Sequence, residues 1–90
     1  MASQNLIGKR VKMRREAAGL TQDQLAGACQ RLGWDLSRVS VTKIETGIRA
    51  VNDAEVIVLA AALKCPASDL IDKIPVKLAI KAVRQGQATS

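Results

Sequence analysis

The chain has 90 residues, of which 48% are hydrophobic and 24% charged, a composition typical of one small globular domain and not of a disordered or collagen-like chain. Histidine is absent, which removes the commonest general base and transition-metal ligand, so no enzyme activity, catalytic residue, metal site or cofactor is predicted. The net charge is +6, and residues 1–49 carry nine Lys or Arg against four acids, a net +5. This excess favours a polyanionic partner, although a basic soluble surface also accounts for it.

Trp34 is the only aromatic residue, so the interior must consist of Leu, Ile, Val and Ala, which favours an all-α domain. Cys29 and Cys65 lie far apart without neighbouring metal ligands, and both are interpreted as small buried hydrophobic residues. The longest apolar run, Val56–Leu63, is too short to span a bilayer, and the first residues lack the pattern of a signal peptide. We therefore expect a cytoplasmic protein with no membrane partner.

Two helices are predicted at the start of the chain. Ile7 and Val11 begin a helical apolar stripe, and Gly19 suits the left-handed cap that ends many helices. Thr21-Gln22-Asp23-Gln24 is a capping-box sequence that opens a second helix. That helix should run from about Gln22 to Leu32, where a glycine breaks the pattern.

A short third helix is predicted over residues 38–46. Ser37 suits its N-cap, Val41 and Ile44 form its buried side, and Gly47 is a suitable stop. The side chains that project outward are mostly polar or basic: Arg38, Val39, Thr42, Lys43 and Thr46. The connection before this helix holds Trp34 and Leu36, one of which we expect to pack against the core.

Three more helices complete the expected fold. Asn52-Asp53-Ala54-Glu55 is a second capping box and opens a helix that ends near Lys64; a short helix follows at Ser68–Asp72. Past Pro75, an apolar stripe predicts a last helix within residues 74–84. The predicted organisation is a domain over residues 1–73, this C-terminal helix, and a flexible polar tail over residues 85–90.

The motif Thr21-Gln22-x-x-Leu25-Ala26, followed by Val41-Thr42-x-Ile44-Glu45-x-Gly47-x-Arg49, resembles the lambda-repressor and Cro-like helix-turn-helix family, also called the XRE family. The resemblance spans roughly residues 6–71 and implies a five-helix DNA-binding domain with an additional C-terminal helix. It implies that Gln22 bonds the DNA backbone, where a helix N-terminus favours a phosphate. It also implies that Arg38, Val39, Thr42 and Lys43 meet bases or phosphates. Thr46 is a further DNA-binding candidate on the same face.

The resemblance assigns roles to several further residues. Arg15 and Glu45 occupy positions that form an ion pair between the first and third helices in this family. Because Glu45 lies beside the buried face of its helix, its carboxylate would be costly without a partner, and Arg15 would provide one. Arg49 corresponds to a basic residue directed at the backbone or minor groove, and Arg10 and Lys12 are candidates for phosphate contacts. For each of these cations the alternative is a solvated charge.

The chain departs from the family pattern between Ala26 and Ser37, where it is roughly five residues longer than a compact helix-turn-helix. Either the second helix or the turn is lengthened, which leaves the angle between the two helices open. We expect Trp34 to pack this insertion, the alternative being a contact with DNA or a partner.

The resulting prediction is a regulator that binds double-stranded DNA sequence-specifically, and in particular a repressor that occupies an inverted-repeat operator as a homodimer. The dimer interface candidates are Leu70, Ile71, Val76, Ile80 and Val83. Alternatively, the last helix closes the monomer core.

A phage-type repressor, a restriction-modification controller and an antitoxin share this domain, and the resemblance implies a bacterial or phage-encoded protein. The alternative function is a protein-interaction module that binds a toxin or another protein partner.

Overall fold

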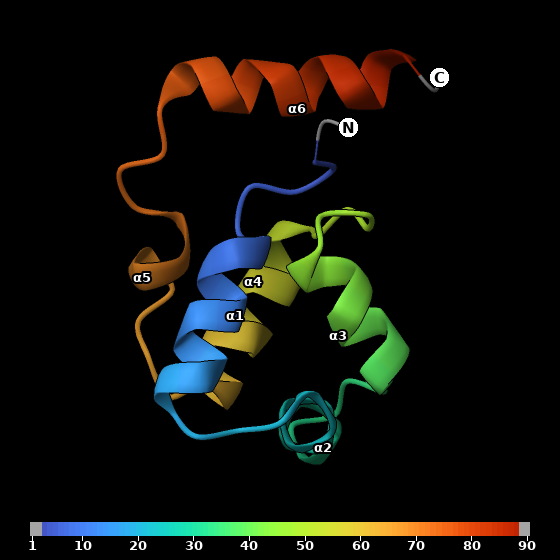
Figure 1. The fold of residues 1–90 in the computed structure, drawn as a ribbon, viewed down its shortest axis with the longest axis vertical. Helices are drawn as coiled ribbons and strands as arrows, with labels where there is room; N and C mark the ends of the chain where they lie inside the picture. The colour runs from blue at the N-terminus through green and yellow to red at the C-terminus, as the bar shows by residue number, and fades with distance from the viewer. Residues whose placement is uncertain (1–2, 89–90) are drawn as a thin grey trace.

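The computed structural model describes residues 3–88, with side chains to residue 84, and within this range the chain forms six helices and no strand (Figure 1). The helices are α1 (Gly8–Ala17), α2 (Gln22–Arg31), α3 (Arg38–Glu45), α4 (Asp53–Ala62), α5 (Ser68–Ile71) and α6 (Val76–Ala88). The all-α prediction is confirmed, and the first five helices lie within one or two residues of their predicted ranges. None of the described helices combines the length and apolar character needed to cross a bilayer.

The helix starts follow the capping residues. In α2 the Thr21 hydroxyl accepts from the Gln24 amide while the Gln24 side chain accepts from the Thr21 amide, and Asn52 and Glu55 form the same reciprocal pair at α4. The Ser37 hydroxyl accepts from the backbone of α3. These local contacts fix where α2, α3 and α4 begin.

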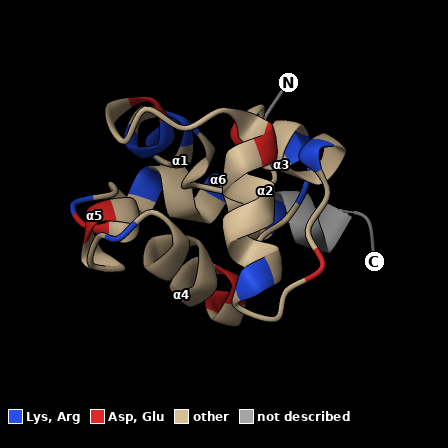
Figure 2. Cartoon of the chain, turned by 90° about the horizontal axis from the view of Figure 1, so that it is seen from below, with Lys and Arg blue, Asp and Glu red and all other residues tan. Residues whose placement is uncertain are grey.

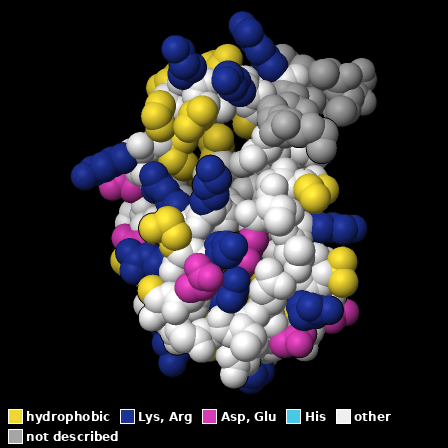
Figure 3. All heavy atoms as spheres, viewed as in Figure 1, with side chains coloured by type: hydrophobic (Ala, Val, Ile, Leu, Met, Phe, Trp, Pro, Cys, Tyr) yellow, Lys and Arg dark blue, Asp and Glu magenta, His cyan; other side chains and the backbone are white. Residues whose placement is uncertain are grey.

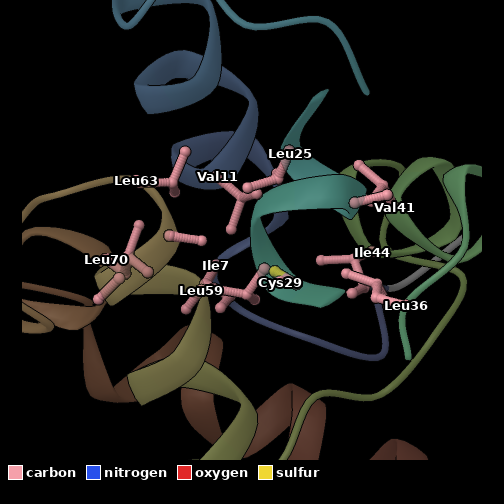
Figure 4. Packing of buried hydrophobic residues seen from close by; sticks show 13 residues of the cluster. Ile7, Val11, Leu25, Cys29, Leu36, Val41, Ile44, Leu59, Leu63 and Leu70 are labelled. Atoms are coloured by element: carbon pink, nitrogen blue, oxygen red, sulfur yellow. The ribbon is translucent and has the colours of Figure 1, made fainter. Parts of the chain in front are cut away.

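The core collects side chains from α1 to α5 and from the connection before α3 (Figure 4). Its largest members are Ile7, Val11, Leu25, Cys29, Leu36, Val41, Ile44, Leu59, Leu63 and Leu70. Leu70 is fully buried, so its assignment to a dimer interface is wrong: in the four-residue α5 this side chain anchors the helix to the monomer core. Its neighbour Ile71 is 52% exposed.

Residues 32–37 join α2 to α3 and are longer than the turn of about three to four residues in a compact helix-turn-helix. Part of the extra length therefore lies in the connection. Leu36 is buried in the core, and Trp34 packs against the core from its edge. The expected packing role of Trp34 is thus present in the structure.

The C-terminal helix α6 lies across one end of the molecule, opposite α2 (Figure 1). A groove of about 520 Å³ separates it from the N-terminal segment and the end of α3, with Leu6, Thr46, Leu78 and Ala82 among the lining residues. Val76 and Val83 are 75% and 55% exposed, so the alternative in which this helix closes the monomer core does not hold.

The backbone of α6 is helical to Ala88, so the helix continues four residues beyond its predicted end at residue 84. Gln85, Gln87 and Ala88 have good helix propensity, and no proline follows Pro75, so the single Gly86 does not end the helix. The last two residues of the predicted tail, 89 and 90, lie outside the described range.

Candidate nucleic-acid interface

The outward face of α3 presents five side chains that the sequence singles out. Val41 and Ile44 point into the core, and the helical period therefore turns the opposite positions to solvent. Those positions are all exposed: Arg38, Val39, Thr42, Lys43 and Thr46. Seen from below, α3 shows basic positions beside α2 (Figure 2).

Val39 is 57% exposed on this polar face, and Arg38 precedes it at the start of the helix. The Arg38 Nε lies 3.8 Å from an Asp23 carboxylate oxygen, and both side chains are largely exposed. Solvent screens such a pair and leaves it worth little. The Arg38 guanidinium is therefore available to a stronger anionic or hydrogen-bonding partner.

Gln22, the first residue of α2, connects the start of that helix to α3. Its Nε2 donates to Glu45 Oε1 at 3.1 Å, and its Oε1 accepts from the Thr42 hydroxyl at 2.8 Å. These bonds hold the free amides at the N-terminus of α2 beside the outward face of α3. An anion at this point meets both the helix dipole and the basic side chains of α3.

Beneath Gln22 lies the ion pair between Arg15 and Glu45 that the resemblance implies. The Arg15 Nε and Nη2 donate to the two Glu45 carboxylate oxygens at 2.6 and 3.0 Å, and Nη1 donates to the Leu20 carbonyl at 2.8 Å. The hydrogen bonds with Glu45 raise the pKa of Arg15, against the opposing effect of burial. The pair joins α1 to α3 and fixes the helix from which the outward face projects.

Arg49 does not lie on the outward face of α3. Its guanidinium donates to both Glu55 carboxylate oxygens at 3.1 and 2.9 Å and stacks over the Trp34 ring at 5.9 Å from the ring centre. Hydrogen bonding raises the pKa of Arg49 and lowers that of Glu55. In this structure Arg49 therefore joins the lengthened connection to the start of α4.

The two cations suggested on α1 have different surroundings. Arg10 donates to the Asp72 carbonyl after α5, and one helical turn later Arg14 donates to Asp69 at 2.6 Å. Because α5 and α3 lie on opposite sides of α1 (Figure 1), Arg10 is held away from the outward face of α3. Lys12 is exposed on α1.

Asn5, a buried residue that positions the end of α3, was not predicted from the sequence. Its Nδ2 donates to the carbonyls of Ile44 at 3.0 Å and Arg49 at 2.8 Å, while its Oδ1 accepts from the amides of Ile7 and Gly8 at 3.0 and 2.7 Å. An asparagine side chain readily accepts hydrogen bonds from the amides two and three residues further on, and this local signal was available in the sequence. The contact with α3 across the fold had no sequence signal.

A comparison of the sequence with models of known protein families identifies the family to which these helices belong. A family model described as a helix-turn-helix domain matches residues 6–72, a range that contains α1 to α5 and stops before α6. Comparisons with curated proteins and with solved structures gave no significant match. The match covers the α2–α3 pair and the helices that pack around it, and the chain belongs to the helix-turn-helix domain family.

Proposed function

We propose that this protein is a sequence-specific regulator that binds double-stranded DNA in the lambda-repressor and Cro-like (XRE) manner and acts as a repressor. The observation that carries the proposal is the junction at Gln22, where the start of α2 is hydrogen-bonded to the outward face of α3. A helix N-terminus suited to a phosphate and a basic helix suited to a groove then meet one duplex together.

The side chains on α3 fit the chemistry of a major groove. An arginine at the leading end, Arg38, can bind guanine through two hydrogen bonds, and Val39 can pack on a thymine methyl group. Lys43, one turn further along, can reach guanine or a phosphate. Together with the absence of histidine, these residue types support a binding protein and not an enzyme. The bacterial or phage origin and the cytoplasmic location remain proposals that rest on the family resemblance.

One domain reads too short a site for strong specificity. Helix α3 has eight residues, which gives it a length of about 12 Å at 1.5 Å per residue. Only about three to four base pairs fit beside such a helix. Two half-sites in an inverted repeat, read by a two-fold dimer, would supply the missing contacts.

We assign the dimer contact to the apolar side of α6 with Ile71, where a second copy of the chain would pack. Hydrophobic side chains gather on α6 at one end of the molecule (Figure 3). Val76, Ile80 and Val83 are 75%, 45% and 55% exposed, and the helical period places Lys77, Lys81 and Arg84 to one side of this stripe. The basic side chains therefore need not meet across a dimer axis.

The DNA-binding proposal is tested by selecting bound sequences from a random duplex pool at several salt concentrations. We expect an inverted repeat, and we expect Arg38→Ala to relax one base position in each half-site by about 1 to 3 kcal/mol. Arg31→Ala, which removes an exposed arginine at the far end of α2, is the matched control. Binding that varies only with salt, with no enriched sequence, would reduce the interaction to non-specific charge attraction.

The dimer proposal is tested by analytical ultracentrifugation. We expect the wild type to sediment as a dimer at micromolar concentration and Ile80→Asp to sediment as a folded monomer, with Lys77→Ala as the control on the same helix. A monomeric wild type would refute the dimer. The exposed face of α6 would then favour the second candidate, a protein-interaction module such as an antitoxin with a toxin or other protein partner.

A further inference from the structure

A chain of hydrogen bonds runs from the buried ion pair to the surface of α3. Arg15 donates to Glu45, Gln22 Nε2 donates to Glu45 Oε1 at 3.1 Å, and the Thr42 hydroxyl donates to Gln22 Oε1 at 2.8 Å. The chain ends at Thr42, which is exposed on the outward face. The direction of donation along it decides what Thr42 can offer to a ligand.

The first link fixes the orientation of the Gln22 amide. A carboxylate held by a guanidinium has no hydrogen to donate, so a neighbour of the Glu45 oxygens must be a donor. The amide of Gln22 therefore presents its nitrogen to Glu45 and its oxygen to Thr42. An amide turned the other way would place two acceptor oxygens against each other.

The second link uses the only hydrogen of the Thr42 hydroxyl. Among the residues that the structure describes, two atoms lie within hydrogen-bond distance of Thr42 Oγ1: Gln22 Oε1 at 2.8 Å and the Arg38 carbonyl at 3.2 Å. Both are acceptors, so the hydroxyl hydrogen points into the protein whichever of them receives it. The two lone pairs of Oγ1 remain, and they can only accept hydrogen bonds.

We propose that Thr42 determines specificity by accepting a hydrogen bond from an exocyclic amino group, adenine N6 or cytosine N4, in the major groove. This inference rests on the proposed DNA-binding function. Phosphate oxygens, guanine O6 and N7, and thymine O4 are all acceptors and give the Thr42 oxygen no hydrogen to receive. Adenine N6 and cytosine N4 are the donors that the groove presents.

The test is a double-mutant cycle between the Thr42 hydroxyl and single atoms of the selected DNA site. Thr42→Val removes the hydroxyl at nearly constant shape, and Thr42→Ser is the control that keeps it. The duplexes lack one exocyclic amino group at a time, with purine in place of adenine or pyrimidin-2-one in place of cytosine. Comparing the wild type and Thr42→Val on each duplex cancels the effect of a weakened base pair.

We expect one position in each half-site at which removing the amino group lowers the affinity of the wild type and of Thr42→Ser about three- to tenfold more than that of Thr42→Val. The inference is overturned if no amino group couples to the hydroxyl. It is also overturned if the coupling is to a keto oxygen, measured with 2-aminopurine for guanine or 5-methylpyrimidin-2-one for thymine. Failure of the DNA-binding proposal itself is distinguishable, because no sequence would then be selected by the wild type.

Discussion

Arg15 of α1 and Glu45 of α3 meet through two hydrogen bonds of 2.6 and 3.0 Å, with their side chains only 10% and 2% exposed. Two charges this deeply buried are tolerable only as a pair, since either one alone would lie in the interior without compensation. The contact also links the first helix to the helix proposed to meet DNA. Its loss would affect both stability and the position of α3.

We therefore expect Glu45→Ala to lower the free energy of unfolding by about 3 to 5 kcal/mol, as measured by urea denaturation. Asp35→Ala, at an exposed position of the connection between α2 and α3, is the control and should change little. Replacing both partners, as in Arg15→Met/Glu45→Leu, should recover much of the loss because no lone charge remains buried. An unchanged unfolding midpoint for Glu45→Ala would contradict a structural role for the pair.

A second prediction concerns the contact between α1 and the end of α3. A Cβ added at Gly8 would lie 2.3 Å from the Ile44 carbonyl oxygen, so Gly8→Ala should cost about 1 to 3 kcal/mol of stability by forcing the two helices apart. Gly27→Ala in α2 is a matched control, because its nearest neighbour would be the end of the Arg31 side chain at 3.5 Å. There alanine should stabilise the helix by about 0.5 to 1 kcal/mol. Thermal unfolding of the two variants should thus shift in opposite directions.

A third prediction concerns acid stability. The hydrogen bonds from Arg49 hold the pKa of Glu55 below its ordinary value of 4.5, so the folded protein binds this proton less readily than the unfolded chain does. The stabilisation is complete above the ordinary value and is lost as the pH falls through the lower folded pKa. Urea unfolding followed by Trp34 fluorescence should show this loss below about pH 4.5 in the wild type.

Glu55→Gln should remove the pH-dependent stabilisation that comes from the Glu55 carboxylate. The free energy of unfolding of this variant should therefore change less steeply with pH in the same range. Glu16→Gln, which replaces an exposed carboxyl that makes no contact with Arg49, is the matched control. Equal slopes for the wild type and Glu55→Gln would show that the pair with Arg49 contributes nothing to folding. In the Glu55 variant the Trp34 emission should also change, because the cation above its ring loses its carboxylate partner.

A fourth prediction uses the cysteines as reporters. Cys29 is fully buried, and burial raises the pKa of its thiol, so both access and ionisation are suppressed in the folded state. In Cys65→Ala protein the remaining thiol should react with a disulfide reagent only as fast as the domain opens. The rate should rise in Glu45→Ala and in urea. Rapid labelling of the native protein would be inconsistent with the packed core.

The fold could be predicted largely from local signals. The capping boxes at Thr21 and Asn52 and the N-cap at Ser37 act within four residues, and the structure contains all three. The outward face of α3 follows from the helical period once Val41 and Ile44 are placed inside. Periodicity alone could not separate Leu70 from Ile71, because a four-residue helix has no repeat to average over.

The positions of the basic side chains were harder to predict for a different reason. Arg10 and Arg49 are residues of the type that contacts phosphates. A long cationic side chain, however, adopts the conformation that reaches the acceptors placed near it by the fold. Those acceptors were the Asp72 carbonyl, 62 residues further along the chain, and Glu55 at the start of α4. The apolar stripe of α6 could be predicted from the sequence. Whether this stripe packs on the monomer core or on a second molecule could not, because that depends on the shape of the surfaces it meets.

The bonds from Asn5 to the carbonyls of Ile44 and Arg49 span 39 and 44 residues of sequence, and this separation bears on the order in which the domain is assembled. During synthesis the N-terminal segment leaves the ribosome first and has to wait for residue 49 before its side-chain amide finds both acceptors. The capping boxes close as soon as their own few residues are available, whereas the C-terminal end of α3 is completed by a long loop closure. We therefore expect the C-terminal end of α3 to gain its final protection from hydrogen exchange late in folding, after the capped first turns of α2 and α4 have formed.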